Sequence, residues 1–210
     1  MYRLNKTITC LFLLLMSLKC FSQGFASYEV KSFIDKGIEV VVDNSFKAYE
    51  IQTFASKNAS LVTVIGKGFA SYEVKSFIDK GMKVVVDNSF KAYEIQTFVS
   101  KSASLVTVIG KGFASYEVKS FIDKGMKVVV DNSFKAYEIQ TFASENASLI
   151  TVIGEGFASY EVKSFIDKGV EVVVDNSIAS YEIKSFISKN ASLVTVIGKG
   201  FTAYEIKFLY

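Results

Sequence analysis

Apolar residues recur along this chain in two alternating patterns. In the first, Val30, Phe33 and Ile34 lie three to four residues apart, the spacing of one face of a helix. In the second, short β-branched runs such as residues 38–44 and 61–66 end at turn residues, which is typical of strands in a parallel sheet. The pattern therefore predicts helices that alternate with strands.

The pattern repeats every 44 residues. The segment GFASYEVKSFIDKG begins at Gly24 and returns in each copy; the copies are 24–67, 68–111, 112–155 and 156–199, with a partial copy at 200–210. Each copy holds two coils, and the second coil has two extra residues near Ala59. We expect a single repeat domain over 23–210, an α/β fold that forms a right-handed α/β solenoid of ~22-residue helix-strand coils, with a parallel sheet on one side and helices on the other.

An all-β solenoid is the alternative fold, because ASYEVKS also alternates apolar and polar residues. Helix is favoured by the expected C-terminal caps at Gly37 and Asn58 and by Glu29, which lies early enough to interact with the helix dipole.

Residues 1–22 have the pattern of a secretory signal peptide. Basic Arg3 and Lys6 precede an apolar run over 8–18, and small residues follow. The run is too short to span a bilayer as a helix, which takes about 20 residues. We therefore expect a secreted, periplasmic or cell-envelope protein without a membrane span.

The remaining chain has few groups that could do chemistry. The formal charge of +3 is carried by Arg3, Lys6 and Lys19, so residues 23–210 keep 21 Lys against 21 Asp and Glu, and nucleic-acid binding is not expected. This part also lacks His, Cys, Trp, Pro and Arg. That composition excludes Ser-His-Asp and Cys-His catalysis and metal sites built on His or Cys, and we expect no cofactor.

Two recurring motifs could carry a function. Gly66-Lys67-Gly68 between a strand and a helix resembles a dinucleotide-binding turn, but it recurs in each copy, once with Glu155 in place of lysine, so we interpret it as a tight turn. Nine Tyr-Glu pairs could supply a base or a ring that stacks on a sugar. We favour a structural role, in which tyrosine packs on the next helix and glutamate accepts hydrogen bonds from first-turn amides. The pairs begin at Tyr28, Tyr49, Tyr72, Tyr93, Tyr116, Tyr137, Tyr160, Tyr181 and Tyr204.

The sheet face turned away from the helices is the predicted partner-binding site. If Ile38, Val40 and Val42 in one strand and Leu61, Thr63 and Ile65 in the next face the core, a valine in every strand points outward. A continuous apolar stripe of this kind often marks an interaction surface. The candidate binding residues are these valines and the aspartates at the rim: Val41, Val64, Val85, Val108, Val129, Val152, Val173, Val196, Asp43, Asp87, Asp131 and Asp175.

The sequence thus predicts an exported, non-enzymatic repeat protein that acts as a protein-interaction or structural scaffold through its concave sheet face, with an unknown protein or cell-envelope component as partner. The alternative is a self-assembling or surface-coating homo-oligomer that associates end to end through open strand edges. A carboxylate-based enzyme acting on polysaccharide is the less favoured third hypothesis.

Overall fold

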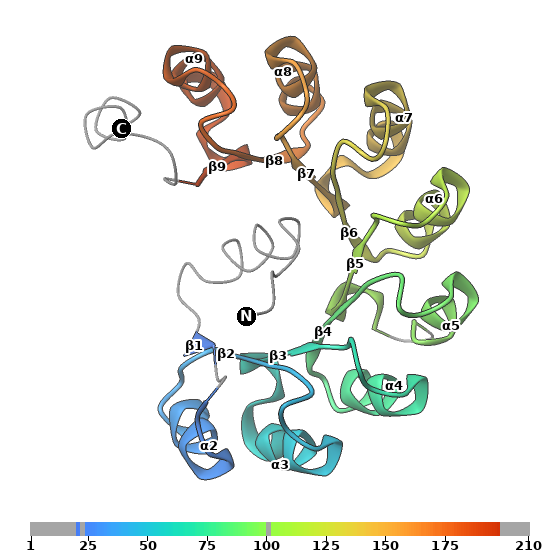
Figure 1. The fold of residues 1–210 in the computed structure, drawn as a ribbon, viewed down its shortest axis with the longest axis vertical. Coiled ribbons are helices and arrows are strands. Elements are labelled where there is room, and N and C mark those ends of the chain that lie inside the picture. The colour runs from blue at the N-terminus through green and yellow to red at the C-terminus, as the bar shows by residue number, and fades with distance from the viewer. Residues whose placement is uncertain (1–19, 22–23, 100–101, 198–210) are drawn as a thin grey trace. The chain divides into compact units, whose positions relative to one another are not determined.

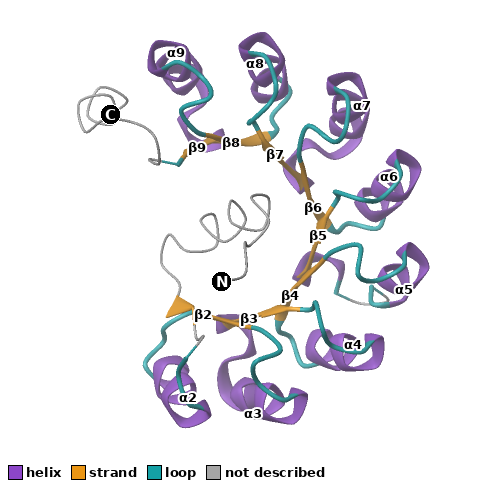
Figure 2. Cartoon of the chain, viewed as in Figure 1, coloured by secondary structure: helices purple, strands orange, loops and turns teal. Residues whose placement is uncertain are grey.

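The computed structural model describes residues 20–21, 24–99 and 102–197. Helices and strands alternate along these residues, and every described strand pairing is parallel (Figures 1 and 2). The protein therefore has an α/β fold, and the all-β alternative is wrong. The predicted signal peptide lies almost wholly outside the described residues, so export stays a prediction.

Within the described residues the chain divides into two compact units, one up to Lys127 and one from Val128. Whether residues 23–210 form a single domain stays a prediction. The elements of the first unit are β1 (Cys20–Phe21), α2 (Ser27–Asp35), β2 (Val40–Val42), α3 (Ala48–Asn58), β3 (Val62–Ile65), α4 (Ser71–Asp79), β4 (Lys83–Val86), α5 (Ala92–Thr97), β5 (Val106–Ile109) and α6 (Ser115–Asp123). The second unit has β6 (Lys127–Val130), which begins at the boundary, α7 (Ala136–Asn146), β7 (Ile150–Ile153), α8 (Ser159–Asp167), β8 (Glu171–Val174), α9 (Ser180–Asn190) and β9 (Val194–Val196).

In each unit the strands pair in chain order and the sheet is open. β1 to β5 follow one another in the first unit, and β6 to β9 in the second. The helices of each unit lie on one side of its strands (Figure 1). This arrangement follows from coils in which a helix returns the chain to the next parallel strand.

The helix ends confirm one predicted cap and correct the other. Gly37 has φ +80° and donates its N–H to the Ile34 carbonyl at 2.9 Å, as a C-terminal glycine should. Asn58 has φ −142°, so it is not the left-handed cap we expected. The chain instead continues into a 3-10 turn, Ala59–Leu61, which accommodates the two extra residues of the longer coil.

A pair of phenylalanines fills the space between helix and strand in each described coil of the first three copies. Phe69, in the loop before α4, meets Phe77 in the helix edge to face, with ring centroids 5.2 Å apart. Phe77 is fully buried. Burial of one large apolar side chain contributes about 1.5–3 kcal/mol, and an aromatic pair adds about 0.5–1.5 kcal/mol. The helical phenylalanines such as Phe77 are therefore a large part of the core, as the sequence predicted, whereas Phe25, which we also expected in the core, has 38% of its surface exposed.

Strand register decides which side chains face the helices. Val40 pairs with Val62 and Val64 with Val84, so successive pairings advance 22 and then 20 residues along the chain, two fewer than the 44-residue period. The strands are therefore staggered by about one residue per strand, the stagger of an eight-stranded (β/α) barrel with shear 8, although the sheet in each unit is open. Residues at equivalent positions of the repeat are thus displaced along the strand direction by about one residue per strand.

The Gly-Lys-Gly turn is shaped by steric constraints. Gly68 has φ +90°, and a Cβ there would lie 2.2 Å from Nδ2 of Asn44, which belongs to the preceding coil. At Gly66 a Cβ would lie 3.2 Å from the Val85 carbonyl oxygen, which accepts the Gly66 N–H at 2.8 Å. Both glycines are needed for close approach between coils, which supports the interpretation of this motif as a turn.

Replacing Gly68 by alanine should separate the cost of the left-handed backbone from the cost of the steric overlap with Asn44. Gly24 has the same φ of +90°, but no atom lies within 4 Å of its Cβ position. We expect Gly24→Ala to lose about 1–2 kcal/mol for the left-handed backbone alone, and Gly68→Ala to lose more because Asn44 is in the way. Urea unfolding measures both losses. Adding Asn44→Ala should recover most of the extra loss, because only the Cβ of residue 44 then stays close, at 3.2 Å. Equal losses for Gly24→Ala and Gly68→Ala alone would contradict the steric argument.

Candidate functional site: grooves on the helical face

The tyrosines of the helical face are exposed. Those from Tyr28 to Tyr181 have 62–76% of their surface in contact with solvent. Our expectation that each ring packs on the next helix is therefore wrong. Because exposed aromatic rings contribute little to the core, these rings are available for contact with a ligand.

The glutamate of each described Tyr-Glu pair up to Tyr160-Glu161 caps its own helix. Glu29 Oε2 accepts the Ala26 backbone N–H at 2.8 Å, and Glu117 Oε2 accepts that of Ala114 at the same distance. This confirms the expected hydrogen bond from the start of the helix. This hydrogen bond occupies one carboxylate oxygen, Oε2. The hydrogen-bond partners of the second oxygen, Oε1, differ between neighbouring helices.

Between α4 and α5 the second oxygen is also occupied. The Ser71 hydroxyl at the start of α4 donates to Glu94 Oε1 at 2.6 Å, and Ser27 of α2 donates in the same way to Glu50 of α3. The Ser71 hydroxyl and then the Lys91 backbone amide hold the pKa of Glu94 below its ordinary value. In these grooves the carboxylate joins one helix to the next.

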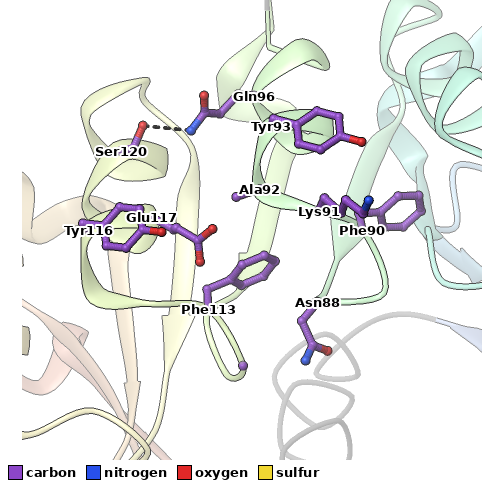
Figure 3. A pocket seen from close by; sticks show the side chains of 11 residues that line it. Asn88, Phe90, Lys91, Ala92, Tyr93, Gln96, Phe113, Tyr116, Glu117 and Ser120 are labelled. Atoms are coloured by element: carbon purple, nitrogen blue, oxygen red, sulfur yellow. Dashed lines mark hydrogen bonds between the residues drawn. The ribbon is translucent and has the colours of Figure 1, made fainter.

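Between α5 and α6 the serine is replaced by Ala92, and the second oxygen has no donor. Within the described residues, Glu117 Oε1 accepts no hydrogen bond. The two helices are joined instead by Gln96, whose Nε2 donates to Ser120 Oγ at 3.1 Å. A groove of about 640 Å³ opens here, and the Glu117 carboxylate points toward its middle (Figure 3).

Aromatic rings wall this groove. Tyr93 comes from α5, Tyr116 from α6, and the half-buried Phe113 from the loop before α6 (Figure 3). The Lys91 ammonium lies 5.8 Å from the centre of the Tyr93 ring, a cation–π contact that orients both side chains. The groove thus combines apolar ring faces with one cation, one anion and the two amides of Asn88 and Gln96.

The same groove recurs in two other copies. Between α3 and α4, Gln52 donates to Ser76 at 3.2 Å, and between α7 and α8, Gln140 donates to Ser164 at 3.0 Å. Each has alanine in place of the serine, and within the described residues each second glutamate oxygen accepts no hydrogen bond. The residues equivalent to Lys91, Ala92, Tyr93, Tyr116 and Glu117 are Lys47, Ala48, Tyr49, Tyr72 and Glu73 in one groove and Lys135, Ala136, Tyr137, Tyr160 and Glu161 in the other.

The predicted exposed valine stripe is wrong. Val42 pairs with Val64, not with Ile65, and a shift of one residue moves every side chain of a strand to the other face. The even-numbered candidates therefore share a face with Val40 and Val42, on the side of the helices. The odd-numbered ones lie on the opposite face with Thr63 and Ile65, which we expected in the core, and with the partly exposed Lys83.

All the candidate valines are buried except the half-buried Val196: Val41, Val64, Val85, Val108, Val129, Val152 and Val173 have at most 4% of their surface exposed.

The rim aspartates belong to the turns after the strands. Asp43 Oδ1 accepts the Ser45 N–H at 2.9 Å, and equivalent bonds of 3.0 Å are made by Asp87, Asp131 and Asp175 to the serines two residues on. Such bonds stabilise the turn that leads into the next helix. Partner binding by the valines and aspartates stays a prediction.

No protein-family model and no curated protein matches this chain. Two solved structures with similar folds are a native KDPGal structure and the copper homeostasis protein CutC from Streptococcus agalactiae. The first is 11% identical, with 79% of this chain and 86% of that chain covered and a TM-score of 0.44. The second is 9% identical, with 64% and 86% covered and a TM-score of 0.32.

The similarities give no support to the predicted function. Neither structure is named as a repeat scaffold, and we withdraw the predictions of a non-enzymatic scaffold and of its self-assembling alternative. The prediction that the chain is not an enzyme is withdrawn with them. At these TM-scores the likeness brings no activity of its own to this chain.

Two further findings concern the described residues only. None of their helices is long and apolar enough to cross a bilayer. No three of their Asp, Glu, His or Cys side chains gather in a way that could hold a metal ion.

The helix-to-helix bond at Glu94 should make stability depend on pH. A carboxylate whose pKa is lowered by folding stabilises the folded state above its ordinary pKa of 4.5, and this contribution is lost as the pH falls through the lowered folded value. We expect Ser71→Ala to be less stable than the native chain at pH 7, with a difference that narrows below about pH 4. Urea unfolding across this range measures it, and a difference independent of pH would contradict the role of Glu94.

Proposed function

We propose that the protein binds a neutral carbohydrate in the groove between α5 and α6. The observation that carries this proposal is the free Glu117 oxygen, which points into a groove walled by two exposed tyrosine rings. A sugar can donate a hydroxyl hydrogen bond to the carboxylate while its C–H face packs on a ring. Such a mixture of ring faces with a few polar groups is typical of sites that bind small molecules.

The charges of the groove favour a neutral ligand. Lys91 and Glu117 both line it and balance each other. A polyanion such as nucleic acid needs a row of uncompensated cations, which this groove does not provide. A glycan of the cell envelope would agree with the envelope partner that the sequence predicts, while a protein partner stays a prediction.

We also propose that the α/β fold is a right-handed solenoid, because crossover connections between parallel strands are almost always right-handed. In such an arrangement the grooves would all open on the helical side. The stagger of the strands would turn successive coils slightly against one another.

The tyrosines are the direct test of the proposed site. We expect Tyr116→Ala to weaken binding of a neutral oligosaccharide at this groove about tenfold and to leave the two equivalent grooves unchanged, because loss of an aromatic contact costs about 1.4 kcal/mol. Cello-, xylo-, manno- and laminari-oligosaccharides are screened first, and isothermal titration calorimetry then measures the affinity of the best one.

Tyr28→Ala is the matched control. Tyr28 is as exposed as Tyr116, with 76% of its surface in solvent, but it belongs to α2, where Ser27 occupies the Glu50 carboxylate of the next helix. Its loss should leave the affinity unchanged. The proposal fails if none of the four sugar series binds at millimolar concentration, or if both tyrosine variants weaken binding equally.

A further inference from the structure

We infer that the ligand is a linear polymer, held once per 44-residue copy, and that the alternation of serine and alanine at the first turns of the helices from α2 to α8 sets this spacing. The inference rests on the proposed function and adds the length of the ligand and the positions of its subsites. It depends on the two kinds of groove that alternate along the helical face.

Serine closes the grooves between α2 and α3 and between α4 and α5 to a hydroxyl-bearing ligand. Where Ser27 or Ser71 is present, its hydroxyl already donates to the carboxylate oxygen that a sugar would need. These grooves also have alanine in place of Lys91 and lysine in place of Gln96, at Ala70 and Lys75 in the case of α4. The polar groups that would orient a ligand are thus either occupied or absent.

Alanine leaves the intervening grooves open. Ala48 and Ala92 carry no donor, and the second oxygens of Glu73 and Glu117 accept no hydrogen bond within the described residues. In each of these grooves a hydrogen bond from glutamine to serine still joins the two helices, so the helices stay together although the glutamate oxygen is not bonded between them. Two identical acceptors between exposed tyrosines therefore recur in the first unit.

A ligand that uses both grooves must present the same chemistry twice at a fixed distance. The grooves between α3 and α4 and between α5 and α6 are two helices apart, about 16–20 Å at the usual separation of packed helices. A regular polysaccharide meets this requirement because its units repeat along an extended chain. Simultaneous contact at two sites raises affinity by a factor on the order of 10² or more.

The length dependence of binding tests the inference. Oligosaccharides of the series that binds best, from the disaccharide upward, are titrated into the intact chain by calorimetry. We expect a modest, nearly constant affinity for short members and a rise of about 10²-fold once the chain reaches both grooves. An affinity that does not change with length would overturn the inference.

A matched pair of double variants tests the alternation. Ala48→Ser with Ala92→Ser places a donor opposite Glu73 and Glu117, and should abolish the rise for long chains. Ser27→Ala with Ser71→Ala makes the reverse change in the other grooves and should keep it. A crystal structure of the first variant should show each new hydroxyl bonded to its glutamate, as Ser71 is to Glu94.

The outcomes separate the inference from the proposed function. Loss of binding in Tyr116→Ala together with an affinity independent of length would keep the single-groove proposal and reject the polymer. Equal effects of the two double variants would reject the role of the alternation. Absence of binding to every sugar series would reject both.

Discussion

Burial of a phenylalanine pair between helix and strand is the interaction on which the rest of the structure depends. Each pair, such as Phe69 and Phe77, joins the loop before a helix to the helix itself, and buries the helical ring completely in the case of Phe77. This contact holds the helix at one distance from its strand, and its recurrence lets successive strands pair in parallel. Buried valines, isoleucines and methionines fill the rest of the interior.

The repetition of this core leaves the helical surface to carry the differences between coils. Helices that begin with serine and helices that begin with alanine both have an apolar side with a central phenylalanine, and α4 and α5 have the same Glu cap. The serine hydroxyl is one of the differences between their grooves, and it decides whether a carboxylate oxygen is bonded to the neighbouring helix. A change that costs the core nothing can therefore alter what the surface binds.

Periodicity predicted the helices, the strands, the Gly37 cap and the buried Phe pairs, because each of these is decided by contacts close in sequence. It failed for the valine stripe. We aligned Val42 with Ile65, whereas Val42 pairs with Val64, and a slip of one residue exchanged the two faces of every second strand. The extra residues before β3 form a 3-10 turn, and their number alone did not reveal this register.

The sequence by itself determined the repeat, the order of helices and strands and the glycine turns, since local conformation and the burial of apolar residues follow from neighbouring positions. Tertiary structure alone decided the strand register, the exposure of the tyrosines and the partners of the second glutamate oxygens. Those features depend on how one coil lies against the next, and Ser71 and Glu94, 23 residues apart, meet only after the chain has completed a coil.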